Sequence, residues 1–295
     1  MKLKLLALAS CAIMAATPAS ALSVVSNSSA SALASALVSP GSGISIVGGS
    51  ETYQGGATQG GTYSGFSLSN STTTITLGDG VVLTSGDVGD IPGNDSTAIS
   101  SNPGAGSDAD LQSISAQTVT NDANVLSFDF TAAPGITSID LDFVFASDEF
   151  PNQSVTDIFG VFVDGINYAF FPNGDLVNFT LGSANAGLFF DNDFGSADPF
   201  EDASGTALEY DGIYQPLSLT GILDMNLATH TIKIAIGDTN DTAFDSGVFI
   251  TGLGGGTSTG GGGIDPTTVP LPASLPLLLV AVAGVGMITR RRSNA

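Results

Sequence analysis

The chain has 295 residues and a formal net charge of −22 at neutral pH, because 28 acidic residues face only six basic ones. Lys2, Lys4 and Arg290 to Arg292 lie near the two ends, so the central part holds Lys233 alone. Such a chain is a poor partner for nucleic acid and other polyanions. It lacks Trp and has one Cys, Cys11, and one His, His230. This composition excludes a cysteine nucleophile, a multi-histidine metal site and an arginine clamp for phosphate in the central part.

The N-terminal residues have the pattern of a signal peptide. Lys2 and Lys4 precede a mostly apolar run, Leu5 to Ala16, and Ala19-Ser20-Ala21 forms an A-x-A cleavage site. We therefore predict a signal peptide over residues 1–21, with Ala19 and Ala21 read by the processing enzyme. The mature chain would begin near Leu22.

The next segments alternate as β-strands do. Leu126, Phe128 and Phe130 alternate with polar residues, and the apolar residues of 139–145 and 232–236 follow the same period. A period of two places one set of side chains on a buried face. Segment 158–163 is apolar almost throughout, which predicts a strand covered on both sides, and 248–250 supplies a last strand.

Short turns rich in Gly, Asn and Asp separate these runs. Ile75–Leu77 and Val81–Leu83 flank Gly78-Asp79-Gly80, which predicts a hairpin. One helix is expected, from Ser29 to Val38, and Gly48–Gly65 is expected to be loop with weak strand. The fold class is all-β: an antiparallel β-sandwich or jelly roll over residues 22–253. The Gly, Ser and Thr content of 254–268 predicts a flexible linker.

The C-terminal residues 269–295 predict a membrane stop. An apolar run, Leu275–Thr289, is closed by Arg290, Arg291 and Arg292, which places those arginines on the cytoplasmic side. As a helix this run is about 22 Å long, against a bilayer core of about 30 Å. A transmembrane helix this short suits a temporary anchor, and a permanent anchor is the alternative.

The motif before that run is Val269-Pro270-Leu271-Pro272-Ala273. Together with the apolar segment and the Arg cluster, it resembles the VPLPA variant of the PEP-CTERM sorting signals. The resemblance implies an exosortase-like protease that cuts near Val269 to Ala273. The body would then be released from the inner membrane of a Gram-negative bacterium to the cell surface or to exopolysaccharide.

The body also carries motifs of a known family. They are Leu83-Thr84-Ser85-Gly86, Phe143 to Pro151, Asp157-Ile158-Phe159-Gly160, Ile234 to Asp238 and Asp245 to Phe249. These resemble the choice-of-anchor L domain of bacterial surface proteins, over about residues 30 to 252. This chain has Gly237-Asp238 where the family often has Ala-Asp. The resemblance implies a surface address and no established enzymatic activity.

Six acidic residues at predicted strand ends are candidate ligands for calcium. They are Asp148, Glu149 and Asp157 at one strand junction, and Asp238, Asp241 and Asp245 after another strand. If those strands are neighbours, the carboxylates converge and repel one another unless a cation lies between them. Ordinary turn and capping aspartates are the alternative.

A second acidic segment runs from Asp191 and Asp193 to Asp198, Glu201 and Asp202. It begins like an EF-hand loop, but Ser196 stands where that loop needs Gly. We interpret it as a solvated loop.

We therefore predict an exported, non-catalytic surface or extracellular-matrix protein, stabilised by structural calcium. A lectin-like adhesive module that binds exopolysaccharide or a second copy is the first alternative. A glycosidase that pairs Glu149 with Asp157 or Asp245 is the second. The absence of Trp argues against the glycosidase, because sugar rings usually stack on large aromatic faces.

Overall fold

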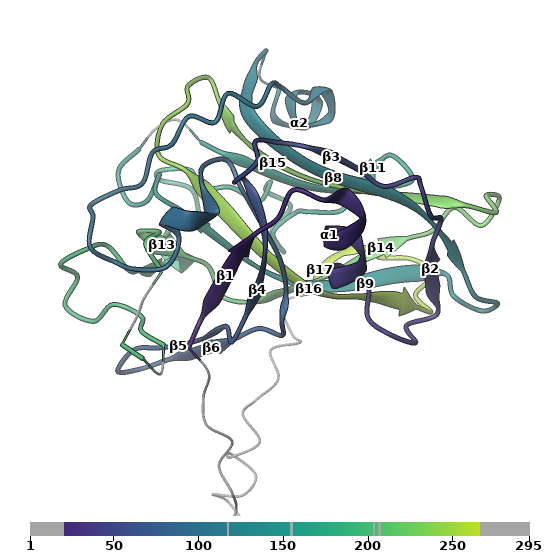
Figure 1. Cartoon of the computed structure of the whole chain (residues 1–295), viewed down its shortest axis with the longest axis horizontal. Helices are drawn as coiled ribbons and strands as arrows, with labels where there is room; N and C mark the ends of the chain where they lie inside the picture. The colour runs from purple at the N-terminus through teal and green to yellow at the C-terminus, as the bar shows by residue number, and fades with distance from the viewer. Residues whose placement is uncertain (1–20, 117, 154–155, 203, 206–207, 266–295) are drawn as a thin grey trace, which may run out of the picture.

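The computed structural model describes residues 21–116, 118–153, 156–202, 204–205 and 208–265. This part is built mainly of antiparallel strands, with two α-helices (Figure 1). The helices are α1 (Ala30–Leu37) and α2 (Ala109–Ser115), and the 3-10 turns are η1 (Val88–Asp90) and η2 (Ala186–Leu188). The strands are β1 (Ser23–Ser26), β2 (Ile44–Ile46), β3 (Thr52–Gln54), β4 (Gly60–Ser64), β5 (Ser67–Ser69), β6 (Thr74–Thr76), β7 (Gly80–Thr84), β8 (Thr120–Ala132), β9 (Ser138–Ser147), β10 (Ile158–Val163), β11 (Ile166–Asn167), β12 (Phe190–Asp191), β13 (Gly212–Ile213), β14 (Leu217–Ile222), β15 (His230–Thr239), β16 (Ser246–Gly256) and β17 (Gly263–Asp265).

Two antiparallel sheets form the body. The larger sheet has the order β1-β4-β7-β16-β9-β13-β12, and β9 also pairs with β14, which pairs with β17. The smaller sheet has the order β11-β10-β15-β8-β2, with β3 added on β8. A separate ribbon joins β5 to β6. The predicted antiparallel β-sandwich is confirmed.

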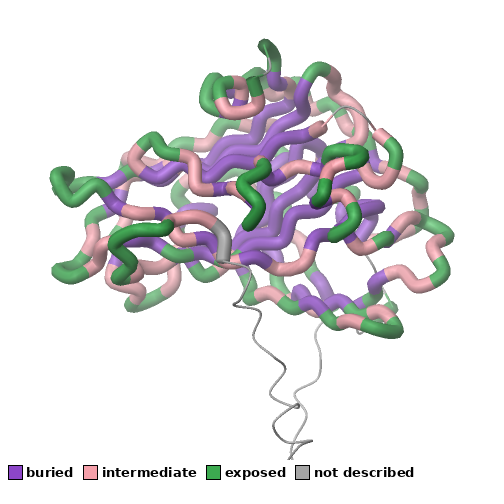
Figure 2. The backbone as a smooth tube through the Cα atoms, turned by 180° about the vertical axis from the view of Figure 1, so that it is seen from behind, coloured by how far each residue is buried: buried purple, intermediate pink, exposed green. Residues whose placement is uncertain are grey.

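The main core lies between the two sheets, where the buried parts of the long strands run through the centre of the molecule (Figure 2). Phe143 and Phe145 of β9 meet Phe128 and Phe130 of β8 in one apolar cluster. These side chains come from the predicted alternating segments. Burial of their apolar surface stabilises the folded state by about 25 cal/mol per Å².

Further apolar layers cover the outer faces of both sheets. Val82, Val144 and Phe249 point away from the main core and pack with residues such as Phe66 near the β5–β6 ribbon. On the smaller sheet, Leu111 of α2 joins a separate cluster with side chains of β8, β10 and β15. Strand β10 is therefore covered on both sides, as its continuous apolar run predicts.

Three sequence predictions need correction. The 75–83 hairpin is wrong, because β6 pairs with β5 whereas β7 pairs with β4 and β16. Helix α2 was missed because its short sequence is mostly polar. Its start is fixed by Asp108, which accepts hydrogen bonds from two backbone N–H groups. The expected 254–268 linker is partly strand, since β16 extends to Gly256 and β17 pairs with β14.

The predicted targeting segments fall almost wholly outside the described residues. Ala19, the motif Val269, Pro270, Leu271, Pro272 and Ala273, and the cluster Arg290, Arg291 and Arg292 all lie there, whereas Ala21 is the first residue described. Within the described ranges, the structure contains no helix long and apolar enough to cross a membrane.

Replacing Gly80 with Ala tests why β7 leaves the ribbon and joins the larger sheet. A Cβ at Gly80 would lie 2.0 Å from the Ile250 carbonyl oxygen of β16, and backbone cannot yield as a side chain does. We expect Gly80→Ala to lower the free energy of unfolding by about 1–3 kcal/mol or more, as overpacking does. Urea denaturation measures this. Gly48→Ala, whose Cβ meets nothing within 4 Å, is the control, and equal stability of the two variants would contradict the account.

Candidate metal centre

The six acidic residues singled out in the sequence meet at one end of the sandwich. Asp148 and Glu149 follow β9, Asp157 precedes β10, Asp238 and Asp241 lie at the end of β15, and Asp245 precedes β16. We call these six the acidic cluster. Strands β9 and β16 belong to the larger sheet and β10 and β15 to the smaller one, so the cluster spans both sheets. The Asp148 N–H donates to the Asp245 carbonyl at 3.0 Å, and the β10–β15 pairing sets Ile158 beside Gly237.

Most of the cluster is enclosed. Glu149, Asp157, Asp238 and Asp245 are 0% exposed and Asp148 is 2% exposed, whereas Asp241 is only half-buried. Acidic residues are almost never fully buried unless they are paired.

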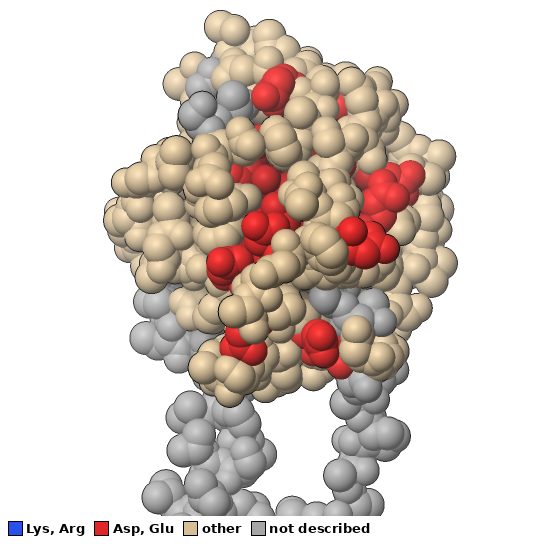
Figure 3. All heavy atoms as spheres, turned by 90° about the vertical axis from the view of Figure 1, so that its left-hand side faces the viewer, with Lys and Arg blue, Asp and Glu red and all other residues tan. Residues whose placement is uncertain are grey.

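The structure offers this cluster no basic partner within the described residues. Lys233 bonds to Asp108 and Asp110 at 2.6 and 2.7 Å. His230 bonds to Asp164 at 2.8 Å. Figure 3 shows the end of the molecule that carries β13, where acidic side chains form a band and no Lys or Arg is visible.

Several of the enclosed carboxylate oxygens receive no hydrogen bond from the protein. Both oxygens of Glu149, Asp157 and Asp238 are buried without a donor in hydrogen-bonding geometry. One oxygen of Asp241 and one of Asp245 are in the same state. The Ser246 hydroxyl lies near enough to Asp157 to lower its pKa, but it bonds to Ser147 Oγ at 2.8 Å. A buried charge without a partner costs several kcal/mol.

Burial and mutual repulsion raise the pKa of these groups. Burial is the main cause for Glu149, whose pKa rises to about 8, and Asp241 and Asp238 add to it. Burial likewise raises the pKa of Asp245 to about 7, with a contribution from Asp122. Burial raises the pKa of Asp157 well above its usual range, and repulsion from Asp238 and Glu149 adds to it. Burial also raises the pKa of Asp238 to about 8, with repulsion from Asp245 and Asp122. At neutral pH these groups therefore hold protons more readily than ordinary carboxyls do.

Asp148 differs from the others because its carboxylate is already bonded. Its two oxygens accept from the backbone N–H groups of Asp211 and Ile99, at 2.7 and 2.5 Å. Burial still raises its pKa to about 7. Asp148 fixes the loops around the cluster rather than leaving a free ligand oxygen.

The motifs behind the family resemblance meet at this cluster. Ser85 Oγ accepts from Ser246 N at 3.0 Å and lowers the pKa of Asp238. A Cβ at Gly86 would lie 1.9 Å from Asp245 Oδ2, so only glycine leaves room for that carboxylate. Segment 83–86 thus shapes the acidic site from a third stretch of the chain.

Sequence reasoning missed Asp122. It is 2% exposed, its Oδ1 accepts from Ala105 N at 3.0 Å, and its Oδ2 is buried without a partner. It raises the pKa of both Asp238 and Asp245. The residue stands in the polar start of β8, where only the β8–β15 pairing brings it beside Asp238.

The backbone around the cluster is strained. Asp122, Asn240 and Phe244 are non-glycine residues with φ of 46°, 71° and 65°. Such conformations cost about 1–3 kcal/mol each, and they persist where the surroundings hold them. Asn240 and Phe244 directly precede Asp241 and Asp245, and the β8–β15 pairing brings Asp122 near Asp238.

The burial of the acidic cluster limits the chemistry that is open to it. Glu149, Asp157 and Asp245, the carboxylates considered for glycoside hydrolysis, are 0% exposed, so a sugar has no access to them. In the described part of the chain, three or more acidic, His or Cys side chains do not converge at metal-coordination distance. A bound ion would have to draw the carboxylates together by side-chain rotation.

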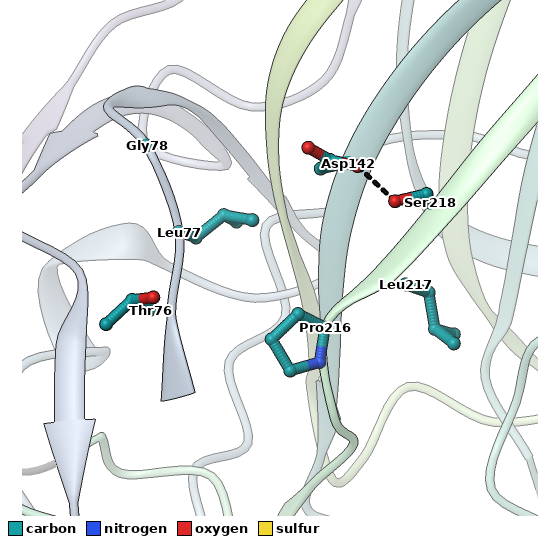
Figure 4. Close-up of a pocket in the computed structure, with 7 residues that line it drawn as sticks. All are labelled: Thr76, Leu77, Gly78, Asp142, Pro216, Leu217 and Ser218. Carbon is teal, nitrogen blue, oxygen red and sulfur yellow. Dashed lines mark hydrogen bonds between the residues drawn. The ribbon is translucent and has the colours of Figure 1, made fainter. Parts of the chain in front are cut away.

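A surface hollow elsewhere on the larger sheet has no part in the cluster. It is lined by Thr76, Leu77, Gly78, Asp142, Pro216, Leu217 and Ser218 (Figure 4). Its one carboxylate, Asp142, accepts from Ser218 Oγ at 2.5 Å. With no unpartnered buried group among these residues, the hollow does not point to a ligand.

Comparison with known protein families shows to which family the chain belongs. The model of the choice-of-anchor L domain matches residues 24–254. The chain belongs to the choice-of-anchor L family. No curated protein and no solved structure matches it. The family is generally non-enzymatic, and membership of it indicates an exported, surface-associated protein.

The raised pKa values predict an unusual dependence of stability on pH in the absence of metal. When the protein is unfolded, these carboxyls titrate near pH 4. When it is folded, Glu149 and Asp245 titrate near 8 and 7. Between about pH 4 and pH 8 the folded state therefore binds more protons than the unfolded state. The stability that these protonated carboxyls contribute is complete below about pH 4 and is lost as the pH rises through 7 to 8. Urea denaturation in EDTA should show stability falling from pH 5 to 8.5, and Glu149→Gln should flatten the slope. Stability that rises over this range would contradict the analysis.

Proposed function

We propose that this choice-of-anchor L protein is a non-catalytic surface or matrix component whose sandwich is stabilised by calcium at the acidic cluster. One observation carries the proposal: fully buried carboxylates with unpartnered oxygens span the two sheets and have no basic neighbour in the part of the chain that the structure describes. A divalent cation would neutralise them in place of the protons that they partly hold at neutral pH.

Calcium fits this donor set better than magnesium or zinc. Calcium accepts six to eight oxygen ligands in flexible geometry, whereas magnesium demands a near-ideal octahedron and keeps several waters. Zinc favours Cys and His, and the chain has one of each, neither in the cluster. Glu149, Asp157 and Asp238 would supply carboxylate oxygens, with Asp241 and Asp245 at the rim of the same group.

The contact around Leu22 supports removal of the leader after Ala21. Leu22 is buried, and its backbone N donates to Asp202 Oδ2 at 2.7 Å. Cleavage at this bond would turn that amide into an α-ammonium group, which is charged near neutral pH. The hydrogen bond would then become an ion pair between the new N-terminus and a buried carboxylate.

The C-terminal signal completes the proposed route. The segment 269–295 would hold the chain in the inner membrane until an exosortase-like protease cuts near Val269 to Ala273. The body would then reach the cell surface, with exopolysaccharide or a second copy as its partner. The mass of the protein recovered from the cell surface tests this route, since it reports both cleavages. Recovery of the uncut 295-residue chain would contradict it.

Calcium should raise the thermal stability of the body. With free calcium about 100-fold above its dissociation constant, the stabilisation is about 2.7 kcal/mol. For a domain of this size, that corresponds to an increase in Tm of about 5–10 °C. Calorimetry at pH 7 in calcium, magnesium and EDTA measures the effect. Relative to EDTA, we expect magnesium to raise Tm less than calcium does.

Variants of single carboxylates separate metal binding from folding. Asp157→Asn should reduce the calcium-dependent rise by the share that the acidic cluster contributes, while leaving stability in EDTA unchanged or higher, because it removes a buried charge. Asp140→Asn, on the exposed face of β9, should keep the full response. An unchanged calcium response in Asp157→Asn would rule out the acidic cluster as the binding site.

The Leu22 contact predicts that the N-terminus and Asp202 are coupled. In a chain that begins at Leu22, Asp202→Asn should cost about 1.5–3 kcal/mol, the value of a hydrogen bond to a charged group. In a chain that retains Ala21, the same substitution should cost less, because the bond is then to a neutral amide. Urea denaturation of the four proteins forms a double-mutant cycle. Equal costs in both backgrounds would refute the ion pair.

A further inference from the structure

A second group of acidic side chains lies around β12 and β13, outside the acidic cluster. Asp191 ends β12, Asp193 follows in the next turn, and Asp211 directly precedes β13. Strands β12 and β13 pair, with Asp191 opposite Gly212. Sequence reasoning treated 191–202 as a solvated loop and did not consider Asp211.

Asp211 is not solvated. It is 4% exposed, and its Oδ1 is buried without a hydrogen-bond partner. Burial raises its pKa to about 8, with further contributions from Asp148, Asp193, Glu209 and Asp191 in that order. A carboxylate in this position is stabilised by a cation.

A neutral oxygen in the same state lies close by. Asn94 Nδ2 donates to the Asn192 carbonyl at 2.7 Å, which fixes the orientation of the amide. Asn94 Oδ1 is then left buried without a donor. Asn192 N in turn donates to the Asp211 carbonyl at 2.8 Å, so Asn192 joins the two unpartnered acceptors.

Two acids near this group, Glu209 and Asp148, are already satisfied by main-chain donors. Glu209 accepts from the N–H groups of Asp95 and Ser96, at 3.0 and 2.7 Å. Asp148 accepts from Asp211 N and Ile99 N. The unpartnered oxygens therefore fall into two separate groups, and Asp148 lies between them.

A surface hollow adjoins this group on the side of Asn94. Asn94 and Asp95 line a surface hollow together with Phe194 and Glu201. The ligand types present, carboxylate and amide oxygens, are those that calcium takes.

We propose that Asp211 and Asn94, with Asp191 and Asp193 of the adjacent turn, form a second calcium site, independent of the acidic cluster. The ion would link segment 93–96 to the turn that follows β12. It would thereby hold the long connection between β12 and β13 against the body. Phe200 in that connection is fully buried and donates its N–H to Asn192 Oδ1 at 2.8 Å. The contacts of Phe200 therefore already hold part of this connection against the body, next to the proposed ion.

Calcium stoichiometry measured on the purified exported protein tests this proposal. Native mass spectrometry and calorimetric titration with calcium alone should give two ions for the unmodified protein. We expect Asp211→Asn to retain only the ion of the acidic cluster, Asp157→Asn to retain only the ion at Asp211, and Asp140→Asn to keep both. Asp193→Asn, in a partly exposed turn, should weaken one site at least several-fold, and it replaces Asp211→Asn if that variant fails to fold.

A local readout assigns the second ion to its place. Hydrogen exchange of residues 191–211 should slow in calcium for the unmodified protein and for Asp157→Asn, but not for Asp211→Asn. One bound ion that Asp211→Asn and Asp193→Asn leave unchanged would overturn the second site and spare the acidic cluster. One bound ion that is lost only in Asp211→Asn would overturn the site at the acidic cluster and keep the second site. No bound ion would overturn both.

Discussion

The structure depends on how it accommodates like charges buried between its two sheets. At the ends of β9, β10, β15 and β16, carboxylates are enclosed where Coulomb repulsion is poorly screened. The main-chain donors of the surrounding loops satisfy Asp148 and Glu209. Glu149, Asp157 and Asp238 receive none. Their charge must be neutralised by protons or by a bound cation.

This constraint gives a structural reason for metal in a protein of this kind. The body has no cysteine, so no disulfide can join the two sheets. A calcium ion among Glu149, Asp157 and Asp245 would connect strand ends from both sheets at one point. It would do so in the extracellular medium, where calcium is available and where a surface protein must stay folded. Inside the cell, the same site would remain protonated or empty and the fold correspondingly weaker.

The sequence predicted well whatever depends on local periodicity. The alternation around Phe128 and Phe143 identified core strands. The acids Asp157 and Asp245 lie near enough for one to raise the pKa of the other, although not within metal-coordination distance of further acids in the described residues. Sequence reasoning failed where a distant neighbour decides the outcome. The 75–83 hairpin was wrong because Gly80 packs against the Ile250 carbonyl, far along the chain. Asp122 and Asp211 were missed for the same reason, since no local pattern sets them apart from turn aspartates.

Proton release on calcium binding tests the central claim most directly. Because carboxyls with a pKa of about 7 to 8 are partly protonated at pH 7, a cation that binds them must displace protons. Calorimetric titration in buffers of different ionisation enthalpy measures that number. We predict net release of protons at pH 7, decreasing toward pH 9 and reduced in Glu149→Gln. Calcium binding without proton release, or no binding at all, would contradict the claim that these buried carboxylates hold a cation.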